Sequence, residues 1–409
     1  MKVALIVFGC RVNQAEFQKL EKSLKIKGYE ITDDLKKADC WIINTCAVTN
    51  KAEIQSRQII NRALKEGKKC FATGCYINLR FPKETENLKI ISNQNKDSII
   101  NYFNTITSSI DSKKINRHRA VVKIQDGCNN YCSYCVVPYL RGKPISYKVS
   151  EIIEEIKDYE SSGIKEIILS GINIGLFGFN EKEKTNLNFL LKNILKKTSI
   201  PKIRLSSIEI NHVDEELLEI MGDSRVCKHL HIPLQHGSDR ILKLMNRKYD
   251  IAQYLKIIEK ILLMYPNIAI GTDLIVGFPS ETEDDFKATL KIAETVNFSY
   301  LHVFNYSKRP FTVAAKMPNH LPEQLKKERT SVLVDIAKAK KRKYIEKFIN
   351  SQLEIIVENR KNHLFTGTSD NYIKCMIENK DGISSGELVI GKVKSIDNDM
   401  AFVSSVIKR

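Results

Sequence analysis

The sequence VKIQDGCNNYCSYCVVPYLRG, residues 122–142, decides how the rest of the chain is interpreted. It contains Cys128, Cys132 and Cys135, spaced C-x3-C-x2-C in a loop that follows an alternating apolar segment at residues 120–124. A strand that ends at this loop would bring the three thiols to one place. Three thiolates can bind three irons of a four-iron cluster and leave the fourth iron open, as catalysis requires. The spacing therefore favours an open iron-sulfur site.

Zinc and disulfide bonds are the alternatives for these cysteines. Structural zinc sites usually supply four ligands as two separated pairs, and no further Cys or His follows here at finger spacing. A disulfide framework is disfavoured because the chain has no secretory signal and its ten cysteines are scattered. No apolar run approaches the roughly 20 residues of a membrane span. We expect a cytoplasmic protein of two or three domains with no membrane association.

The first third of the chain repeats a strand-helix pattern. Apolar runs at residues 3–8, 41–43 and 71–73 each lead to a cysteine, namely Cys10, Cys46 and Cys75. Helical periodicity at 14–27 and 52–66 separates them, which predicts a βαβαβ unit with a parallel sheet. The carboxyl ends of parallel strands lie at one edge, so the three thiols should converge there as a second metal site. The alternative is that they are scattered core cysteines, as we expect for Cys40 and Cys70.

A polar linker at residues 93–119, with a helix at 98–103, precedes six strand-helix repeats. The predicted strands are 120–124, 166–169, 202–206, 229–233, 269–276 and 300–304, and the helices between them are 150–161, 187–197, 215–222, 252–265 and 284–296. This order predicts a partial (β/α)6 barrel of the TIM type, with its site at the carboxyl ends of the strands. Polar or glycine-containing segments stand there, at 170–173, 206–209, 233–238, 277–279 and 305–309.

The last part of the chain is predicted to contain a long basic helix and a small barrel. The helix, residues 325–348, presents either a solvated face or a contact for an RNA backbone. Short strands at 353–358, 371–378, 387–396 and 401–407 predict an antiparallel β-barrel, an architecture that often binds nucleic acid, with Cys375 in its core. The net charge of +17 would attract a polyanion.

Both cysteine triads together resemble those of the radical S-adenosylmethionine methylthiotransferase family, and the resemblance extends over essentially the whole chain. The segments GCRVNQ (9–14), QDGCNN (125–130), MNRKY (245–249), HVF (302–304) and YSKRP (306–310) are most similar to the subgroup that acts on threonylcarbamoyladenosine in tRNA. The chain departs from the family pattern at Asn173, His236, Asn305, Phe311 and Val313. These departures bear on substrate preference and leave all six cysteines in place.

The resemblance implies three domains: residues 1–112 with the second cluster, 113–345 as the radical core, and 346–409 as a TRAM-like RNA-binding module. It implies two [4Fe-4S] clusters and S-adenosylmethionine as cofactors. The cluster on Cys128, Cys132 and Cys135 would bind S-adenosylmethionine and generate a 5'-deoxyadenosyl radical. The cluster on Cys10, Cys46 and Cys75 would carry the sulfur for carbon 2 of the adenine. The implied partners are the anticodon stem-loop of tRNA and an electron donor such as a flavodoxin-type reductant.

Further cofactor contacts are expected near the strand ends. The candidates are Tyr134, Gly171, Asn173, Ser206, Glu209, Gln235, Gly277 and Phe304, each of which could equally serve packing. Three other functions stay open at this point. The substrate could be isopentenyladenosine in tRNA or an aspartate of a ribosomal protein, or the chain could be a zinc-bearing RNA-binding protein without enzymatic activity.

Overall fold

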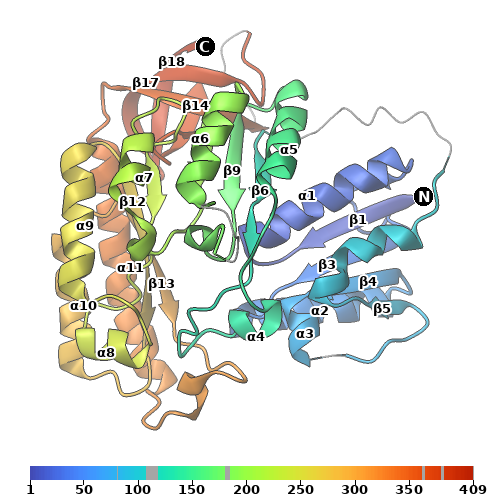
Figure 1. Cartoon of the computed structure of the whole chain (residues 1–409), viewed down its shortest axis with the longest axis horizontal. Coiled ribbons are helices and arrows are strands. Elements are labelled where there is room, and N and C mark those ends of the chain that lie inside the picture. Colours follow the sequence, from blue (N-terminus) through green and yellow to red (C-terminus); the bar gives the residue numbers. More distant parts are fainter. Residues whose placement is uncertain (81, 107–117, 180–184, 362–363, 379–381, 409) are drawn as a thin grey trace.

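A five-stranded parallel sheet forms the N-terminal part of the computed structural model, which describes residues 1–409 except 81, 107–117, 180–184, 362–363, 379–381 and 409 (Figure 1). The strand order is β2 (Glu30–Ile31), β1 (Lys2–Val7), β3 (Cys40–Thr45), β4 (Lys69–Gly74) and β5 (Leu88–Ile90). The predicted βαβαβ unit is thereby confirmed, with β2 and β5 as additional short strands. The predicted domain boundary at 112/113 lies outside the described residues.

Helices cover both faces of this sheet, because its strands are apolar on both sides. On one face α1 (Arg11–Ile26) and the three-ten helix η1 (Asn93–Tyr102) pack on Val3 and Ile42. On the other face α2 (Asn50–Lys65) and α3 (Cys75–Arg80) pack on Trp41 and Ile43. The helix expected at 98–103 is thus a three-ten helix that begins earlier. Cys40 and Cys70 are buried as predicted.

Six parallel strands form the predicted partial barrel. They are paired as β6 (Ala120–Lys123), β9 (Glu166–Ser170) and β10 (Lys202–Leu205), and as β11 (His229–His231), β12 (Ala269–Val276) and β13 (Tyr300–Asn305). A backbone hydrogen bond of 3.0 Å from Ile208 N to His231 O joins the two halves. The covering helices are α5 (Val149–Ser161), α6 (Leu187–Lys197), α7 (Glu215–Ile220), α9 (Ile251–Met264) and α10 (Glu283–Thr295).

Alternate residues of each barrel strand face these helices, since side chains alternate along a strand. Ile167, Ile203, Leu230, Ile270 and Leu301 belong to the core between strands and helices. The other residues of each strand face the lumen. Shorter elements that were not predicted connect the strands: β7 (Gln125–Asp126), α4 (Val137–Arg141), β8 (Ile145–Ser146) and α8 (Asp239–Leu244).

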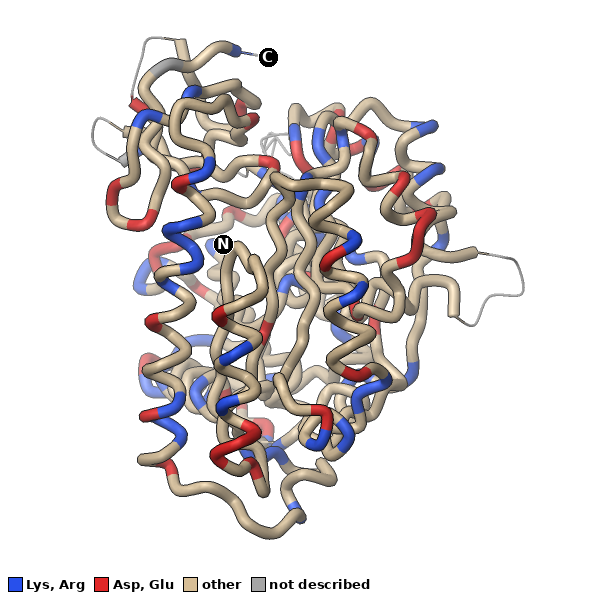
Figure 2. Tube along the Cα trace, turned by 90° about the vertical axis from the view of Figure 1, so that its left-hand side faces the viewer, with Lys and Arg blue, Asp and Glu red and all other residues tan. Residues whose placement is uncertain are grey.

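The long helix α11 (Glu323–Glu346) leads from the barrel to the C-terminal domain. Of its basic side chains, Arg329 is buried between Glu281 and Glu283, at 2.5 and 2.9 Å, and Lys326 is also buried. These two residues anchor the helix to the barrel and do not face solvent. Figure 2 shows Lys and Arg interspersed with Asp and Glu along the chain. None of the described helices is long and apolar enough to cross a membrane.

A closed barrel forms the C-terminal domain, as the sequence predicts, but it has five strands, because β15 (Leu364–Ser369) joins the four that were predicted. Those four are β14 (Gln352–Lys361), β16 (Lys374–Glu378), β17 (Leu388–Asp397) and β18 (Met400–Lys408), and the order in the barrel is β14-β15-β16-β18-β17. Four pairings are antiparallel, and β16 pairs with β18 in parallel. A ring with an odd number of strands cannot alternate direction throughout, so one parallel pairing is required. Cys375 is buried in this core, as expected.

Candidate active site

Both cysteine triads face one cavity of about 630 Å³ between the N-terminal sheet and the barrel strands. Cys10, Cys46 and Cys75 line it from the N-terminal domain, and Cys128, Cys132 and Cys135 line it from the barrel. The sequence predicted each group to gather separately. That they share a single cavity is a result of how the two domains pack.

The loop of the barrel triad is held in place by backbone contacts on two sides. Cys128 N donates to Gly142 O at 3.1 Å, and Ser133 N donates to Met245 O at 3.0 Å. Gly127 has a φ of +70°, and a Cβ atom there would lie 2.1 Å from Lys143 O, so only glycine fits. These contacts and this turn fix the backbone of the loop.

The electrostatics of this loop favour protonated thiols. Burial and the neighbouring Cys132 raise the pKa of Cys135 to about 12, and burial also raises the pKa of Cys128. Arg247 opposes this effect, with its Nη1 3.4 Å from Cys132 Sγ and 3.4 Å from the Tyr134 hydroxyl. Since metals bind thiolates, loading this site must release protons.

The N-terminal triad is brought together by the ends of three adjacent strands. Cys46 and Cys75 directly follow β3 and β4, and Cys10 lies three residues past the end of β1, as predicted. A Cβ atom on Gly9 would lie 2.8 Å from Cys46 Sγ, so glycine lets these two segments approach each other. Burial, with Cys75 and Cys10 nearby, raises the pKa of Cys46 to about 11.

A buried arginine from the barrel domain lies beside this N-terminal triad. Arg141 Nη2 donates to Asn13 Oδ1 at 2.5 Å, and its Nη1 pairs with Asp126 at 2.9 Å and with Glu16 at 3.1 Å. Lys123 also pairs with Glu16, at 2.8 Å. Lys96, which also pairs with Glu16, together with Arg141 and Lys123 holds the pKa of Glu16 well below its usual range despite its burial. The network joins α1 to the barrel.

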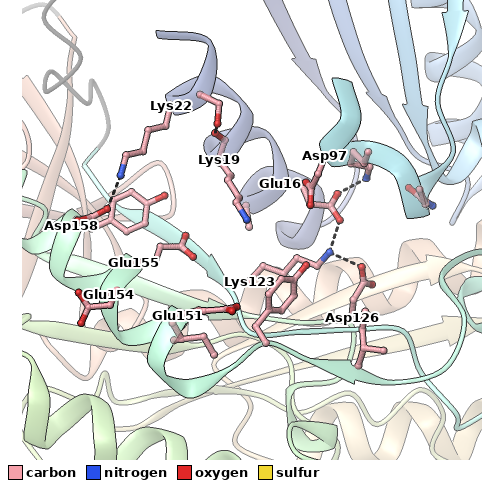
Figure 3. Close-up of a pocket in the computed structure, with 18 of the residues that line it drawn as sticks. Glu16, Lys19, Lys22, Asp97, Lys123, Asp126, Glu151, Glu154, Glu155 and Asp158 are labelled. Atoms are coloured by element: carbon pink, nitrogen blue, oxygen red, sulfur yellow. Dashed lines mark hydrogen bonds and ion pairs between the residues drawn. The ribbon is translucent and has the colours of Figure 1, made fainter. Parts of the chain in front are cut away.

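This charged network borders a second cavity of about 540 Å³ between α1 and α5, in which Figure 3 shows Glu16, Lys123 and Asp126 pointing towards one another. Arg141 lines both cavities. The cysteines do not line this second cavity, so the chemistry belongs to the first one.

Contacts at both edges of the barrel hold the N-terminal domain over its open side. At the first strand, Ala15 of α1 packs on Val121 and Ile168. After the last strand, Arg309 pairs with Glu53 at 2.6 Å and donates to Ala47 O at 3.3 Å, next to Cys46. The domain therefore spans the gap between β6 and β13.

Seven of the eight predicted cofactor contacts line the shared cavity: Tyr134, Gly171, Asn173, Ser206, Glu209, Gln235 and Phe304. Gly277 does not. Its amide donates to Glu281 Oε2 at 2.7 Å, and the Lys326 side chain occupies the space beside it, so it belongs to the anchorage of α11. A Cβ atom on Gly171 would lie 2.8 Å from Gln125 Oε1, so a glycine is needed at this position to leave room for the Gln125 side chain.

The cavity contains polar atoms suited to a cofactor such as S-adenosylmethionine. Ser170 Oγ, Asn173 Nδ2 and Ser206 Oγ are buried and have no hydrogen-bond partner among the described residues. Such atoms are rare in folded proteins because an unmade bond costs free energy. They lie at or just past the carboxyl ends of β9 and β10, so a polar ligand at these strand ends would satisfy them.

Ligand spacing distinguishes iron-sulfur clusters from single zinc ions. Thiolates on one tetrahedral zinc lie about 3.8 Å apart, given Zn–S bonds of roughly 2.3 Å. Among the described residues, only His231, Asp273 and His302 bring three such ligand atoms within 4.8 Å of one another. The three sulfurs of neither cysteine triad lie this close together, so neither triad has the spacing of a single zinc site.

Several residues of the cavity were not identified from the sequence. Arg11, Arg141, Arg247, His229, His231 and Tyr372 all line it. Arg11 and Arg247 lie in the segments that carry the family resemblance, which was the available signal. Tyr372 belongs to the C-terminal barrel, so no local pattern could place it beside the cysteines.

Comparison with known proteins agrees with this geometry. Residues 122–293 match the family described as "Radical SAM superfamily", and residues 2–96 match the one described as "Uncharacterized protein family UPF0004". The fold resembles that of the radical S-adenosylmethionine methyltransferase TsrM from Kitasatospora setae, with a TM-score of 0.56 at 12% identity over 76% of this chain and 74% of that chain. Fold and site together define a radical S-adenosylmethionine enzyme.

Curated relatives identify the family. Threonylcarbamoyladenosine tRNA methylthiotransferase MtaB of Aquifex aeolicus is 36% identical, covering 91% of this chain and 96% of that protein. The tRNA-2-methylthio-N(6)-dimethylallyladenosine synthase of Acetivibrio thermocellus is 34% identical, covering 89% of this chain and 82% of that protein. The chain belongs to the radical S-adenosylmethionine methylthiotransferase family.

Proposed function

We propose that this enzyme inserts a methylthio group at carbon 2 of N6-threonylcarbamoyladenosine, next to the anticodon of tRNA. The observation that carries the proposal is that two cysteine triads from different domains face one cavity. Cys128, Cys132 and Cys135 would bind the [4Fe-4S] cluster that works with S-adenosylmethionine, and Cys10, Cys46 and Cys75 a second cluster. The three domains would be residues 1–112, 113–345 and 346–409, and the enzyme would act in the cytoplasm.

The chemistry needs an enclosed site with fixed contacts. A cluster held by Cys128, Cys132 and Cys135 would supply one electron for the cleavage of S-adenosylmethionine to methionine and a carbon radical able to take a hydrogen atom. Asn173 and Ser206 offer unpaired polar atoms to the cofactor. Arg247, paired with Glu209 and Pro233 O, closes the cavity beside the cysteine loop. The N-terminal domain lies over the open side of the barrel and would limit the access of water to a reactive radical.

The cavity offers a contact suited to a single-stranded RNA base. An adenosine in an anticodon loop is single-stranded, so it can be splayed out and stacked on aromatic side chains at little cost. Phe304 lines the cavity with 42% of its surface exposed, and is available for such stacking. The C-terminal barrel would contact the stem, and a flavodoxin-type reductant would supply electrons.

Nucleosides from a deletion strain test the proposal. We expect tRNA from that strain to contain threonylcarbamoyladenosine without its methylthio group, and the gene to restore the modification. Mass spectrometry of digested tRNA measures both nucleosides. If the strain instead lacks methylthio-isopentenyladenosine and retains methylthio-threonylcarbamoyladenosine, the substrate is dimethylallyladenosine (isopentenyladenosine), the nucleoside in the name of the Acetivibrio relative.

A further inference from the structure

The lumen of this barrel is unusually polar on one side. TIM-type barrels are normally filled with layers of Val, Ile and Leu. Here the lumen-facing residues of β11, β12 and β13 include His229, His231, Asp273, Tyr300 and His302, and all of them line the cavity that holds the cysteines. A lumen built in this way suits a polar ligand that extends inwards from the strand ends.

Arg11 brings a positive charge into this lumen from the N-terminal domain. It lines the cavity, and its Nη2 donates to the Tyr372 hydroxyl at 3.2 Å. Over the residues that the structure describes, no carboxylate pairs with Arg11, whereas Arg141 and Arg247 each have acidic partners. Arg11 is also the first residue of α1, whose first turn has no acidic side chain to offset the helix dipole.

Tyr372 is positioned by an unusual backbone conformation. Its φ is +66°, which bulky residues rarely adopt and which surrounding contacts must impose. Its ring stacks on His229, with 4.2 Å between the ring centroids. Because its oxygen accepts a hydrogen bond from Arg11, its own hydrogen is available to a ligand. His229, which is 4% exposed, also has a buried Nδ1 without a partner among the described residues.

The carboxylates near this point already have hydrogen-bond or ion-pair partners, which reduces their repulsion of an anion. Asp273 accepts from His231 at 3.0 Å and lies 3.2 Å from His302. Glu166 pairs with Arg204 at 2.7 Å. Burial and the nearby Arg204 lower the pKa of His229 well below its usual value, in agreement with a positive local field.

We propose that Arg11 and the Tyr372 hydroxyl bind the carboxylate of the threonylcarbamoyl group, and thereby select this nucleoside over one with an apolar N6 substituent. The inference rests on the proposed function and deepens it. Adenine would lie between the two triads, with its N6 substituent directed into the polar lumen. A dimethylallyl group has no charge and would offer the half-buried Arg11 guanidinium no counter-ion.

Binding of two chemically matched RNAs tests this inference. One is an anticodon stem-loop with threonylcarbamoyladenosine, and the other carries the same nucleoside with its carboxylate converted to a carboxamide. Fluorescence anisotropy on the cluster-loaded enzyme measures both dissociation constants. We expect wild type to prefer the carboxylate about tenfold or more, as is typical of hydrogen bonds to charged groups. Arg11→Gln should remove the preference, and Tyr372→Phe should reduce it.

Lys19→Gln is the matched control, because it removes a positive charge from the exposed face of the same helix, outside the cavity. The inference is overturned if Arg11→Gln weakens the binding of both RNAs equally, so that the preference for the carboxylate is unchanged. In that case, turnover of threonylcarbamoyladenosine by the wild-type enzyme would still support the proposed function. Wild-type enzyme that methylthiolates only the isopentenyl stem-loop would overturn both. If Arg11→Gln fails to load iron, the test is made with Tyr372→Phe: a preference for the carboxylate RNA as large as that of wild type would overturn the inference.

Discussion

Gly9 shows how one residue without a side chain lets two cysteine-bearing strand ends approach each other. Its φ is +93°, and a Cβ atom would lie 2.8 Å from Cys46 Sγ and 2.9 Å from Cys46 Cβ. The strand ends that carry Cys10 and Cys46 can approach only because this atom is missing. The residue therefore matters for two separate reasons, its backbone conformation and its lack of volume.

We expect Gly9→Ala to lose the iron of the N-terminal triad and to keep that of the barrel triad. The left-handed backbone alone costs about 1 kcal/mol, and displacement of Cys46 adds to it. Gly67→Ala separates the two effects, because Gly67 has a φ of +65° with nothing within 4 Å of its Cβ position. Iron content after anaerobic reconstitution is the measurement. Equal iron in both variants contradicts the role given to the Cys46 contact.

At the scale of elements, the loop after β13 fastens the N-terminal domain to the barrel. Arg309 in this loop is 3% exposed and contacts the start of α2 and the segment after Cys46. Asn50 N also donates to Ser307 Oγ at 3.2 Å. The loop therefore links the last barrel strand to one of the strand ends that carry the second triad.

We expect Arg309→Gln to reduce methylthiolation about tenfold or more, because a small displacement of one triad relative to the other disrupts positioning. Hydrogen exchange at residues 47–53 should rise. Arg80→Gln is the control, since Arg80 pairs with the same Glu53 at 2.7 Å from an exposed position, where ion pairs contribute little. If both variants lose activity to the same extent, the activity depends on the ion pairs of Glu53, and the role given to the contact between the domains is contradicted.

At the scale of the whole molecule, three domains contribute to one cavity. The N-terminal sheet supplies Cys10, Cys46, Cys75 and Arg11, the barrel supplies the other triad, and the C-terminal barrel supplies Tyr372. The buried network around Arg141 and Glu16 holds the first two domains together. Neither triad is expected to complete the reaction alone.

We expect Cys46→Ala to cleave S-adenosylmethionine under reductant but to form no methylthio product, and Cys128→Ala to do neither. Each variant should retain about four of the roughly eight irons of two [4Fe-4S] clusters. Chromatography of 5'-deoxyadenosine and iron analysis provide the measurements. Product formation by Cys46→Ala would contradict the assignment of a second cluster to the N-terminal triad.

Local patterns in the sequence predicted most elements of the fold. All six barrel strands, and helices such as α6 at Leu187–Lys197, lie within about two residues of the predicted ranges. Apolar residues recur with a period of about 2 in strands and 3.6 in helices, and this local pattern can be recognised without the tertiary structure. The short strands β2 and β5 and the parallel pairing of β16 with β18 were not predictable in this way, because they depend on partners distant in sequence.

The sequence by itself determined the six cysteines and the convergence of each triad, because strand ends in a parallel sheet share an edge. Only the tertiary structure decided that the two triads face one cavity, that Gly277 lies outside it, and that Arg11 and Tyr372 meet in the lumen. These results depend on the packing of α1 on β6, the contacts of Arg309 and the docking of the C-terminal barrel. Such contacts join residues hundreds of positions apart, and no local periodicity encodes them.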